Sequence, residues 1–299
     1  MLKPSIPAKN TNAFAFCADD NVLPYALFAA YHAAILNPDR NFDILICSLS
    51  PITLPDPFLE AGIIPVHLDI GDHMMAQGLT VRRLTITSFL RLWLPEAFAD
   101  TYARIFYVDT DTDIVDSNLS DFARLDLGDH AIGGVRDIAQ WTDIDRPVHE
   151  FDIRDIGGGA YLNAGVLLID TEKFNRRDFL ARMLETNRTM APFIHNDQSL
   201  INLTLRHEWA ELHPNWNWQG LRLLRRFTEQ ATPRVMHYVG PRKPYDPKQA
   251  ARYYPRALVA DYARFMETYF PERPTIALGR DWALVRALRE RRHTRIGRE

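Results

Sequence analysis

Residues 104–113, RIFYVDTDTD, decide how this sequence is interpreted. The first five are an apolar and aromatic run that predicts a buried strand, and the run ends directly in alternating carboxylates. On an extended backbone, residues i and i+2 point the same way, so we expect Asp109 and Asp111 to share one side. Two such carboxylates repel unless a cation lies between them, and Mg²⁺ or Mn²⁺ suits oxygen ligands. The alternatives are a solvated acidic turn and the equally spaced pair Asp111 and Asp113.

Other apolar runs along the chain alternate with segments of helical pattern. Strands are predicted at 13–18, 42–49, 63–68, 104–108, 131–135 and 164–169, and helices at 24–36, 81–94, 176–190 and 197–206. This alternation predicts an α/β fold with a mostly parallel sheet. Because ligands bind beyond the carboxyl ends of such strands, we expect Asp19, Asp109 and Asp137 near one edge of the sheet.

The composition is that of a folded protein and excludes several classes. The 299 residues are 46% hydrophobic and 24% charged, with a formal charge of -3, which argues against a disordered chain and against a strongly basic nucleic-acid binder. Cys17 and Cys47 lie in apolar runs and are expected to be small buried residues in a reducing compartment. Neither a signal peptide nor an apolar run long enough to span a membrane is visible, so we expect a cytoplasmic location.

The segment MHYVGPRKPY, 236–245, carries a second set of candidate ligands. The neutral imidazole of His237 can ligate Mn²⁺ beside carboxylates, although an isolated histidine can equally be a structural or surface residue. Gly240 permits close backbone approach to a phosphate, and Lys243 supplies a positive charge.

Four further polar residues lie in loop-like or mostly apolar segments: Asn163 in LNAGVLLID, Asp197 and Gln198 in HNDQSLIN, and Arg91 in SFLRLWLPE. A carboxamide at a strand start can bind a hydroxyl-rich ligand, and a cation among apolar residues often pairs with a carboxylate or phosphate. The alternatives are a helix cap for Asp197, a solvent-facing Gln198 and a snorkelling Arg91. The triple glycine at 157–159 lacks the spacing of a phosphate-binding loop and is interpreted as a flexible loop.

Five motifs occur in a fixed order between about residues 13 and 245: FCADDN, FLRLWLPE, IFYVDTD, LNAGVLLID, and NDQSLIN with HYVGPRKPY. Together they resemble glycosyltransferase family 8, the retaining galactosyl- and glucosyltransferases that include bacterial lipopolysaccharide glycosyltransferases and glycogenin. The resemblance implies a GT-A fold and the Mn²⁺-dependent (or Mg²⁺-dependent) transfer of galactose or glucose from a UDP-sugar to a glycan or lipid-linked acceptor.

The resemblance also implies a role for each matching residue. The implied metal ligands are Asp109, Asp111 and His237. The implied donor-binding residues are Ala18, Asp19 and Asn21 at the uridine, Thr110 between the two acidic ligands, and Gly240 and Lys243 at the diphosphate. Arg91, Asn163, Asp197 and Gln198 would surround the donor sugar as the catalytic group. The sequence departs from the common family pattern at Cys17, Val22, Phe89 and Tyr245.

Only one loop and the C-terminal tail offer candidate features for recognising the acceptor. Residues 136–156 lie where the family places acceptor-binding loops, and Asp137 and Trp141 are candidate contacts, unless this is a variable surface loop.

We divide the chain into a catalytic domain, 1–245, and a helical extension, 246–299. Residues 280–299 carry seven arginines against three acidic residues, with apolar residues at helical spacing, which fits peripheral attachment to an anionic membrane or a solvated helix.

Two other function classes remain open at this stage. One is a GT-A protein that binds a nucleotide sugar without turnover, against which the intact acidic, histidine and lysine residues argue. The other is a nucleotidyltransferase, which normally has a glycine-rich basic loop near its N-terminus, whereas FCADDN is acidic.

Overall fold

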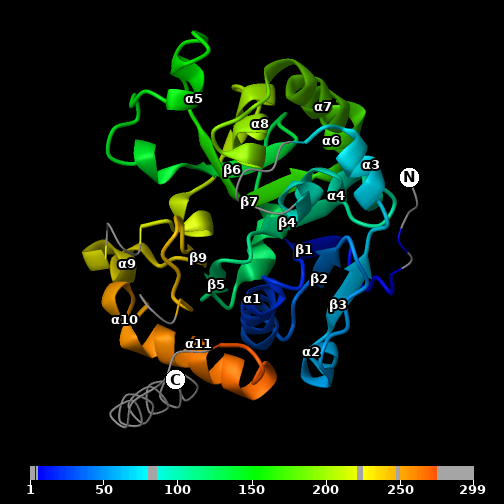
Figure 1. Ribbon diagram of the computed structural model, residues 1–299, viewed down its shortest axis with the longest axis vertical. Helices are drawn as coiled ribbons and strands as arrows, with labels where there is room; N and C mark the ends of the chain where they lie inside the picture. The colour runs from blue at the N-terminus through cyan, green and yellow to red at the C-terminus, as the bar shows by residue number, and fades with distance from the viewer. Residues whose placement is uncertain (1–3, 5, 80–85, 221–224, 247–249, 275–299) are drawn as a thin grey trace.

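The computed structural model describes residues 4, 6–79, 86–220, 225–246 and 250–274. Within them, a seven-stranded sheet is the centre of the molecule (Figure 1). Its strands, in spatial order, are β3 (Ile63–His67), β2 (Asp43–Ser48), β1 (Asn12–Cys17), β4 (Arg104–Val108), β7 (Leu162–Asp170), β6 (Ile132–Arg136) and β8 (Ala210–Glu211). A separate two-stranded sheet pairs β5 (Thr112–Ile114) with β9 (Val235–His237).

The sheet is mixed but mostly parallel, which confirms the predicted fold class. Strands β3, β2, β1 and β4 are parallel to one another, and β6 is parallel to β8. Strand β7 runs antiparallel to both β4 and β6. All six strands predicted from apolar runs are present, with ends that differ from the prediction by no more than two residues.

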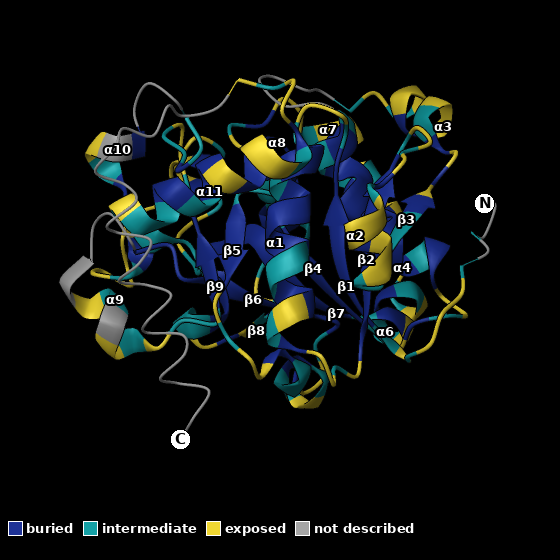
Figure 2. Ribbon diagram, turned by 90° about the horizontal axis from the view of Figure 1, so that it is seen from below, coloured by how far each residue is buried: buried dark blue, intermediate teal, exposed yellow. Residues whose placement is uncertain are grey.

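Side-chain alternation along the strands divides the hydrophobic core into two halves, one on each face of the sheet. Figure 2 shows the central strands as buried, and the exposed residues lie mostly on the surrounding helices and loops. Phe14, Phe16 and Phe106 point to one face and pack with α1 (Leu23–Leu36) and α11 (Arg256–Tyr269). Ala15 and Tyr107 point to the other face and belong to a cluster with residues of η1 (Ile86–Leu92), α7 (Phe179–Met190) and α8 (Asn196–Thr204). The sheet is therefore covered on both faces, and only its edges are open to ligands.

The remaining helices are short. They are α2 (Asp56–Glu60), α3 (Gly71–Ala76), α4 (Leu94–Ala97), α5 (His149–Asp152), α6 (Thr171–Arg176), α7 (Phe179–Met190), α8 (Asn196–Thr204), α9 (Arg225–Ala231) and α10 (Ala250–Tyr253), with 3₁₀ turns η1 (Ile86–Leu92), η2 (Leu119–Arg124), η3 (Ile138–Gln140) and η4 (Pro214–Asn217). The helix predicted at 176–190 is confirmed as α7, which begins three residues later because Asp178, with a φ of 50°, separates it from α6.

The helix predicted at 81–94 is wrong for its described part, which is the 3₁₀ turn η1 followed by α4; residues 80–85 lie outside the described residues. Two contacts explain the difference. Arg91 Nε donates to the Ser88 carbonyl, 2.8 Å away, which is the acceptor that an α-helical Leu92 N–H would need. Pro95 has no N–H and cannot extend an α-helical pattern back to the carbonyl of Arg91.

Beyond residue 245, helix α11 packs on α1, the first helix of the fold. The ring of Tyr262, on α11, stacks on Phe28 of α1 with 3.7 Å between centroids, and its hydroxyl donates to the carbonyl of Thr112. The helical prediction for this region is confirmed by α10 and α11, whereas residues 280–299 lie outside the described residues. In the described part of the chain, no helix is both long and apolar enough to cross a membrane.

A buried amide joins α8 to the beginning of β7. The side chain of Asn202 is 1% exposed, accepts from the Leu162 N–H at 2.8 Å and donates to the Leu162 carbonyl at 2.9 Å. We predict that Asn202→Ala lowers the free energy of unfolding by about 2 kcal/mol, because it leaves buried backbone groups without these partners. Thr204→Ala on the same helix, whose hydroxyl bonds only within that helix, is the control and should cost less than about 1 kcal/mol in urea unfolding. Equal losses of unfolding free energy in the two variants would contradict this role of the Asn202 side chain.

Candidate active site

The acidic motif leaves the sheet through a turn. Strand β4 ends at Val108, residues 109–111 form the turn, and β5 begins at Thr112, whose hydroxyl donates to the Asp109 carbonyl at 2.8 Å. The carboxylates of Asp109 and Asp111 do converge, as predicted. The predicted extended backbone is wrong, because a turn brings the two side chains together. Because β5 pairs with β9, Thr112 lies opposite His237, and the pairing brings the imidazole beside Asp111.

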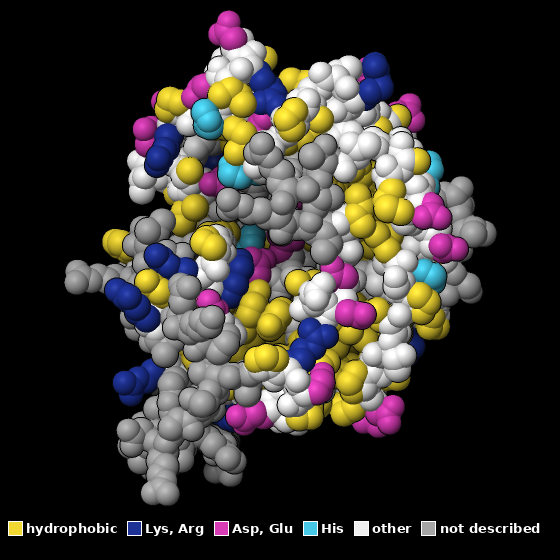
Figure 3. Space-filling model, in the orientation of Figure 1, with side chains coloured by type: hydrophobic (Ala, Val, Ile, Leu, Met, Phe, Trp, Pro, Cys, Tyr) yellow, Lys and Arg dark blue, Asp and Glu magenta, His cyan; other side chains and the backbone are white. Residues whose placement is uncertain are grey.

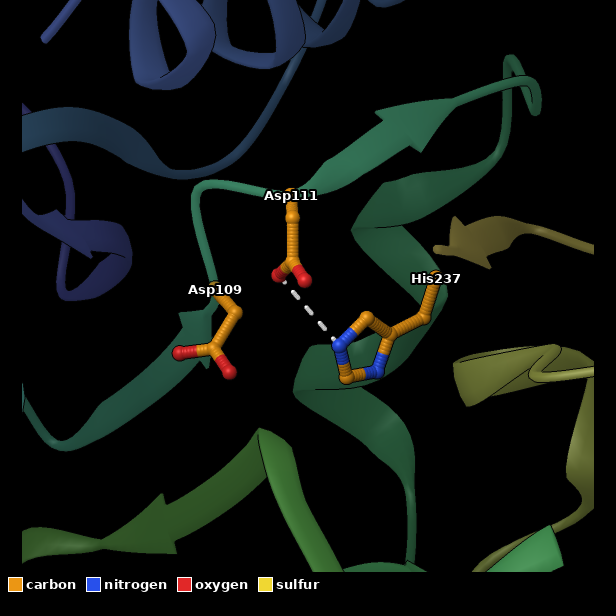
Figure 4. Close-up of side chains that lie close together, drawn as sticks. All are labelled: Asp109, Asp111 and His237. Carbon is orange, nitrogen blue, oxygen red and sulfur yellow. Dashed lines mark ion pairs between the residues drawn. The ribbon is translucent and has the colours of Figure 1, made fainter. Parts of the chain in front are cut away.

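Three side chains from these elements face a common point (Figure 4). Oxygen atoms of Asp109 and Asp111 and a ring nitrogen of His237 all lie within 4.8 Å of one another. Gly165 of β7 makes this approach possible, because a Cβ there would lie well inside 3.0 Å of the His237 ring and 2.9 Å from Asp109 Oδ2. The absence of a side chain at this strand position is therefore required by the cluster.

A chain of amides orients the His237 ring. The Gly165 N–H donates to Asn163 Oδ1 at 3.1 Å, and the same oxygen accepts from Asn217 Nδ2 at 2.9 Å. The Asn217 oxygen is thus left to accept from His237 Nδ1–H, 2.9 Å away. In this neutral tautomer, Nε2 presents its lone pair to Asp111 Oδ1 at 3.3 Å. Such a contact needs a cation or a second ring proton between the two atoms.

Asp111 is held ionised. Burial alone would raise the pKa of its carboxyl, but Lys243 and His237 outweigh burial and hold that pKa well below its usual range. Lys243 Nζ forms an ion pair with Asp111 Oδ2 and donates to the Tyr238 carbonyl at 2.8 Å. Two carboxylates and an oriented imidazole are a donor set that Mn²⁺ and Mg²⁺ accept, so these residues fit a divalent cation.

Arg91 is the buried cation behind this cluster. Its side chain is 6% exposed and forms ion pairs with Asp109 at 2.7 Å and Asp197 at 3.2 Å. It also donates to the Ala164 carbonyl at 2.7 Å and lies over the Tyr107 ring, whose hydroxyl donates to Asp109 at 2.5 Å. The snorkelling alternative for Arg91 is excluded, because the guanidinium is enclosed.

The two carboxylates that share Arg91 differ in their surroundings. Burial raises the pKa of the Asp197 carboxyl to about 6, although Arg91 opposes this effect. Asp197 lies at the first turn of α8 with its side chain 6% exposed, whereas the side chain of Asp109 is 26% exposed. Both carboxylates share the single guanidinium of Arg91. Arg91 therefore does not fully offset the cost of burying the ionised Asp197 carboxylate.

A cavity of about 520 Å³ opens from the acidic cluster (Figure 3). Asp109, Asp111 and His237 lie at one end of its lining, together with Gly240, whose φ is 86°. Asn163, Gln198 and Asp137 also line it and are joined: Asn163 Nδ2 donates to Asp137 Oδ2 at 3.3 Å and to Gln198 Oε1 at 3.2 Å. The Ala164 N–H, which donates to Gln198 Oε1 at 3.1 Å, fixes the orientation of this amide.

The residues expected at a nucleotide are not part of the cavity lining within the described residues. Ala18 continues β1 and donates its N–H to Cys47, while Asp19 accepts from the Asn21 N–H at 2.9 Å in an Asx turn. This turn begins α1, whose Tyr25 stacks on Tyr245 with 3.6 Å between ring centroids. Tyr245 follows Lys243 by two residues, so ring stacking joins the turn to the segment that carries the lysine.

The other singled-out features have ordinary structural surroundings. Cys17 and Cys47 are buried, free and opposite each other in β1 and β2, as expected for small core residues. The glycine loop at 157–159 receives hydrogen bonds from Arg206, and these glycines do not line the described cavity. Trp141 packs against Trp218 and donates its indole N–H to the Arg136 carbonyl at 2.7 Å. It is likewise not among the described residues of the cavity wall.

Sequence reasoning missed the amides of the segment NWNWQG. Asn217 and Gln219 are 0% and 3% exposed, and Gln219 accepts from the Ile138 N–H and donates to the Arg136 carbonyl. Asn217 is one of the residues that set the His237 tautomer. The alternation of amides with tryptophans in this segment could have identified them. Such a pattern predicts buried amides, which need hydrogen-bond partners.

A comparison with family models matches residues 13–248 to glycosyl transferase family 8. The chain belongs to this family. The five motifs quoted above lie inside the matched region, so the resemblance that they suggested is confirmed. Membership makes the protein a glycosyltransferase and makes the cavity its candidate active site.

Relatives of this family 8 chain are distant. General stress protein A of Bacillus subtilis is 22% identical over 253 residues, covering 77% of this chain and 86% of that protein. Glycosyltransferase GlyA of Streptococcus pneumoniae is 27% identical over 177 residues, 57% of this chain, and the match spans only 23% of GlyA. A structure of the galactosyltransferase LgtC with donor and acceptor sugar analogues has a TM-score of 0.62 at 21% identity, covering 91% of this chain and 99% of LgtC. This similarity shows the GT-A fold.

We predict that Gly165→Ala weakens the binding of Mn²⁺ at least about 10-fold, because the added methyl group displaces His237 and Asp109. The matched control is Gly134→Ala in the neighbouring strand, where a Cβ would have ordinary contacts of 3.5 Å or more. Titration of each variant with Mn²⁺ by calorimetry measures the effect. Unchanged affinity in Gly165→Ala would rule out the three-residue cluster as the binding site.

We predict that Asp197 makes folding less favourable as the pH rises toward neutrality. Its carboxyl keeps a proton in the folded state up to about pH 6 but loses it near pH 4 when unfolded, so the stability it contributes is lost as pH rises through 6. The loss from pH 4.5 to 7.5 is about 2 kcal/mol. Asp197→Asn should remove this contribution from the pH dependence of urea unfolding, and parallel pH profiles for the two proteins would contradict the burial effect.

Proposed function

We propose that this chain is a retaining glycosyltransferase that uses a divalent cation, Mn²⁺ or Mg²⁺, to transfer galactose or glucose from a UDP-sugar to a glycan or lipid-linked acceptor. One observation carries the proposal. A candidate metal cluster, with Lys243 paired to its Asp111, lines a cavity whose wall also presents two carboxamides and a carboxylate joined by hydrogen bonds. Family membership supplies the reaction class, and this arrangement supports the finer assignment.

Asp109, Asp111 and His237 would hold the cation. When bound there, a divalent cation supplies positive charge beside a diphosphate leaving group. The Asn217 amide keeps Nε2 of His237 free to act as a ligand, and Arg91 keeps Asp109 in place without occupying its second oxygen. Thr110, between the two acidic ligands, lies in the turn that brings them together.

The donor would lie with its diphosphate toward Lys243 and Gly240. Lys243 is already beside Asp111, and the backbone at Gly240 has a conformation that favours glycine, which permits close approach by a phosphate. Ala18, Asp19 and Asn21 would contact the uridine at the end of β1, the strand that neighbours β4 in the sheet. The stack of Tyr25 on Tyr245 would keep these two regions together.

Asn163, Asp197 and Gln198 would surround the donor sugar, with Arg91 positioning Asp197. The Gln198 amide is fixed by Ala164 and Asn163, so it can stabilise positive charge that develops at the anomeric carbon but is not a nucleophile. Departure of UDP would leave an oxocarbenium-like sugar. The acceptor hydroxyl would then attack from the same face and give its proton to the departing phosphate, which retains the anomeric configuration.

The alternatives differ in their support. The glycosyl transferase family match favours glycosyl transfer over a nucleotidyltransferase. The intact cluster, with Lys243 beside it, favours turnover over a protein that only binds a nucleotide sugar. The division into a catalytic domain, 1–245, and an extension, 246–299, remains a proposal. So do a cytoplasmic location and attachment of residues 280–299 to an anionic membrane.

We predict that the purified protein hydrolyses or transfers from UDP-galactose or UDP-glucose only when Mn²⁺ or a similar cation is present. Asp111→Asn should reduce this activity roughly 100-fold or more, because it removes a ligand charge and the partner of Lys243. The control is Asp126→Asn, an exposed acidic residue whose side chain accepts from the Gly128 N–H. Released UDP and product NMR measure rate and anomeric configuration.

Full activity in EDTA would contradict the metal assignment. Binding of UDP-sugars without any turnover would support the inactive alternative, and synthesis of a nucleotide sugar would support a nucleotidyltransferase. A product of inverted configuration would contradict retention while leaving glycosyl transfer intact.

A further inference from the structure

The cavity has a second end, away from the acidic cluster, and this end is basic. Arg146, His149 and His195 line it, and all three side chains are exposed. Figure 3 shows histidines beside the hollow whose floor is acidic. The wall of a single cavity thus changes from carboxylates at the candidate metal cluster to a guanidinium and two imidazoles farther out.

Arg146 and the two histidines have no carboxylate partner among the ion pairs of the described residues. Among the described residues, Arg146 Nη1 donates only to the Ala139 carbonyl, 3.5 Å away. The acidic residues of the same wall are already engaged. Glu150 is 1% exposed and paired with Arg154 at 2.5 Å, and Asp137 Oδ2 accepts from two amides. The basic end therefore offers positive charge and hydrogen-bond donors that the protein itself does not use.

The segments that carry these residues are fixed together. Glu150 Oε2 accepts from the Ile194 N–H at 2.9 Å and from Ser199 Oγ at 2.5 Å, which places the neighbouring His149 and His195 on joined segments. The buried amide of Gln140 donates to the Arg146 carbonyl at 3.0 Å and accepts from the Tyr161 N–H at 3.0 Å. The basic end is thus held against the beginning of β7 and α8, the elements that carry Asn163 and Gln198.

We infer that the acceptor of this enzyme carries an anionic group, a carboxylate or a phosphate, that binds Arg146, His149 and His195. This inference rests on the proposed function. A group on the donor side would meet the acidic cluster and its cation, so an anion at the opposite end belongs to the second substrate. Guanidinium binds carboxylate and phosphate through two parallel hydrogen bonds, and imidazole donates to either anion. The anionic group orients the acceptor so that its hydroxyl faces the donor sugar.

The test compares three probes that differ at one position: methyl galactoside, its 6-carboxylate and its 6-phosphate. Their dissociation constants are measured by ligand-observed NMR with UDP and Mn²⁺ present. One or both anionic probes should bind about 10-fold or more tightly than the neutral one, and the stronger of the two identifies the anion. The ratio should fall to near one in the variant that combines Arg146→Gln, His149→Gln and His195→Gln.

Arg176→Gln, at an exposed ion pair with Glu172, is the control and should keep the wild-type ratio. Arg146→Lys retains the charge but loses the planar fork, so it should keep part of the preference. Equal binding of the three probes by the wild type, or an unchanged ratio in the triple variant, would overturn the inference. Hydrolysis of UDP-sugars on the same preparations reports the proposed function separately. If no donor is turned over while the preference persists, the glycosyltransferase assignment and the acceptor role fall, but the anion site stands.

Discussion

The buried guanidinium of Arg91 is the interaction on which the rest of the site depends. It is enclosed by the ends of β4 and β7 and by α8, and it binds one acidic residue from the first and one from the last. Removing a charge from water is costly unless it is paired and hydrogen-bonded, and here the ion pairs, two carbonyls and the Tyr107 ring satisfy it. Because Arg91 is shared, the same guanidinium positions the metal-facing Asp109 and lowers the pKa of the Asp197 carboxyl, although burial outweighs this effect and raises that pKa to about 6.

Around this cation the site is organised as a series of fixed polar groups. Backbone N–H groups of β7 determine how Asn163 and Gln198 are oriented, Asn163 orients Asn217, and Asn217 determines which nitrogen of His237 is free. Backbone donors cannot flip, so the orientation of each amide is set without a ligand. A catalytic site benefits from such preorganisation, because charge that develops in the transition state meets groups that need not move.

The sequence predicted six of the nine strands in the described residues, because each of the six is an apolar run that ends in polar residues, whereas β5, β8 and β9 are only two or three residues long. It also predicted that Asp109, Asp111 and His237 belong together, but only through family motifs. The physical reason, the pairing of β5 with β9, was not visible, because β9 is three residues long and lies more than 120 residues away in the chain. The helix predicted at 81–94 failed because a side chain, Arg91, takes a carbonyl that a regular helix needs. The role of Gly165 could be recognised only once the imidazole was seen to pack against its backbone.

The central claim is that Asp109, Asp111 and His237 together hold a divalent cation next to the donor diphosphate. The most direct measurement is anomalous diffraction at the manganese absorption edge from crystals grown with Mn²⁺ and UDP. We predict one strong peak within ligand distance of both carboxylates and of His237 Nε2, with the diphosphate completing its coordination. A peak bound elsewhere, or UDP bound in this cavity with no manganese beside these three residues, would contradict the claim.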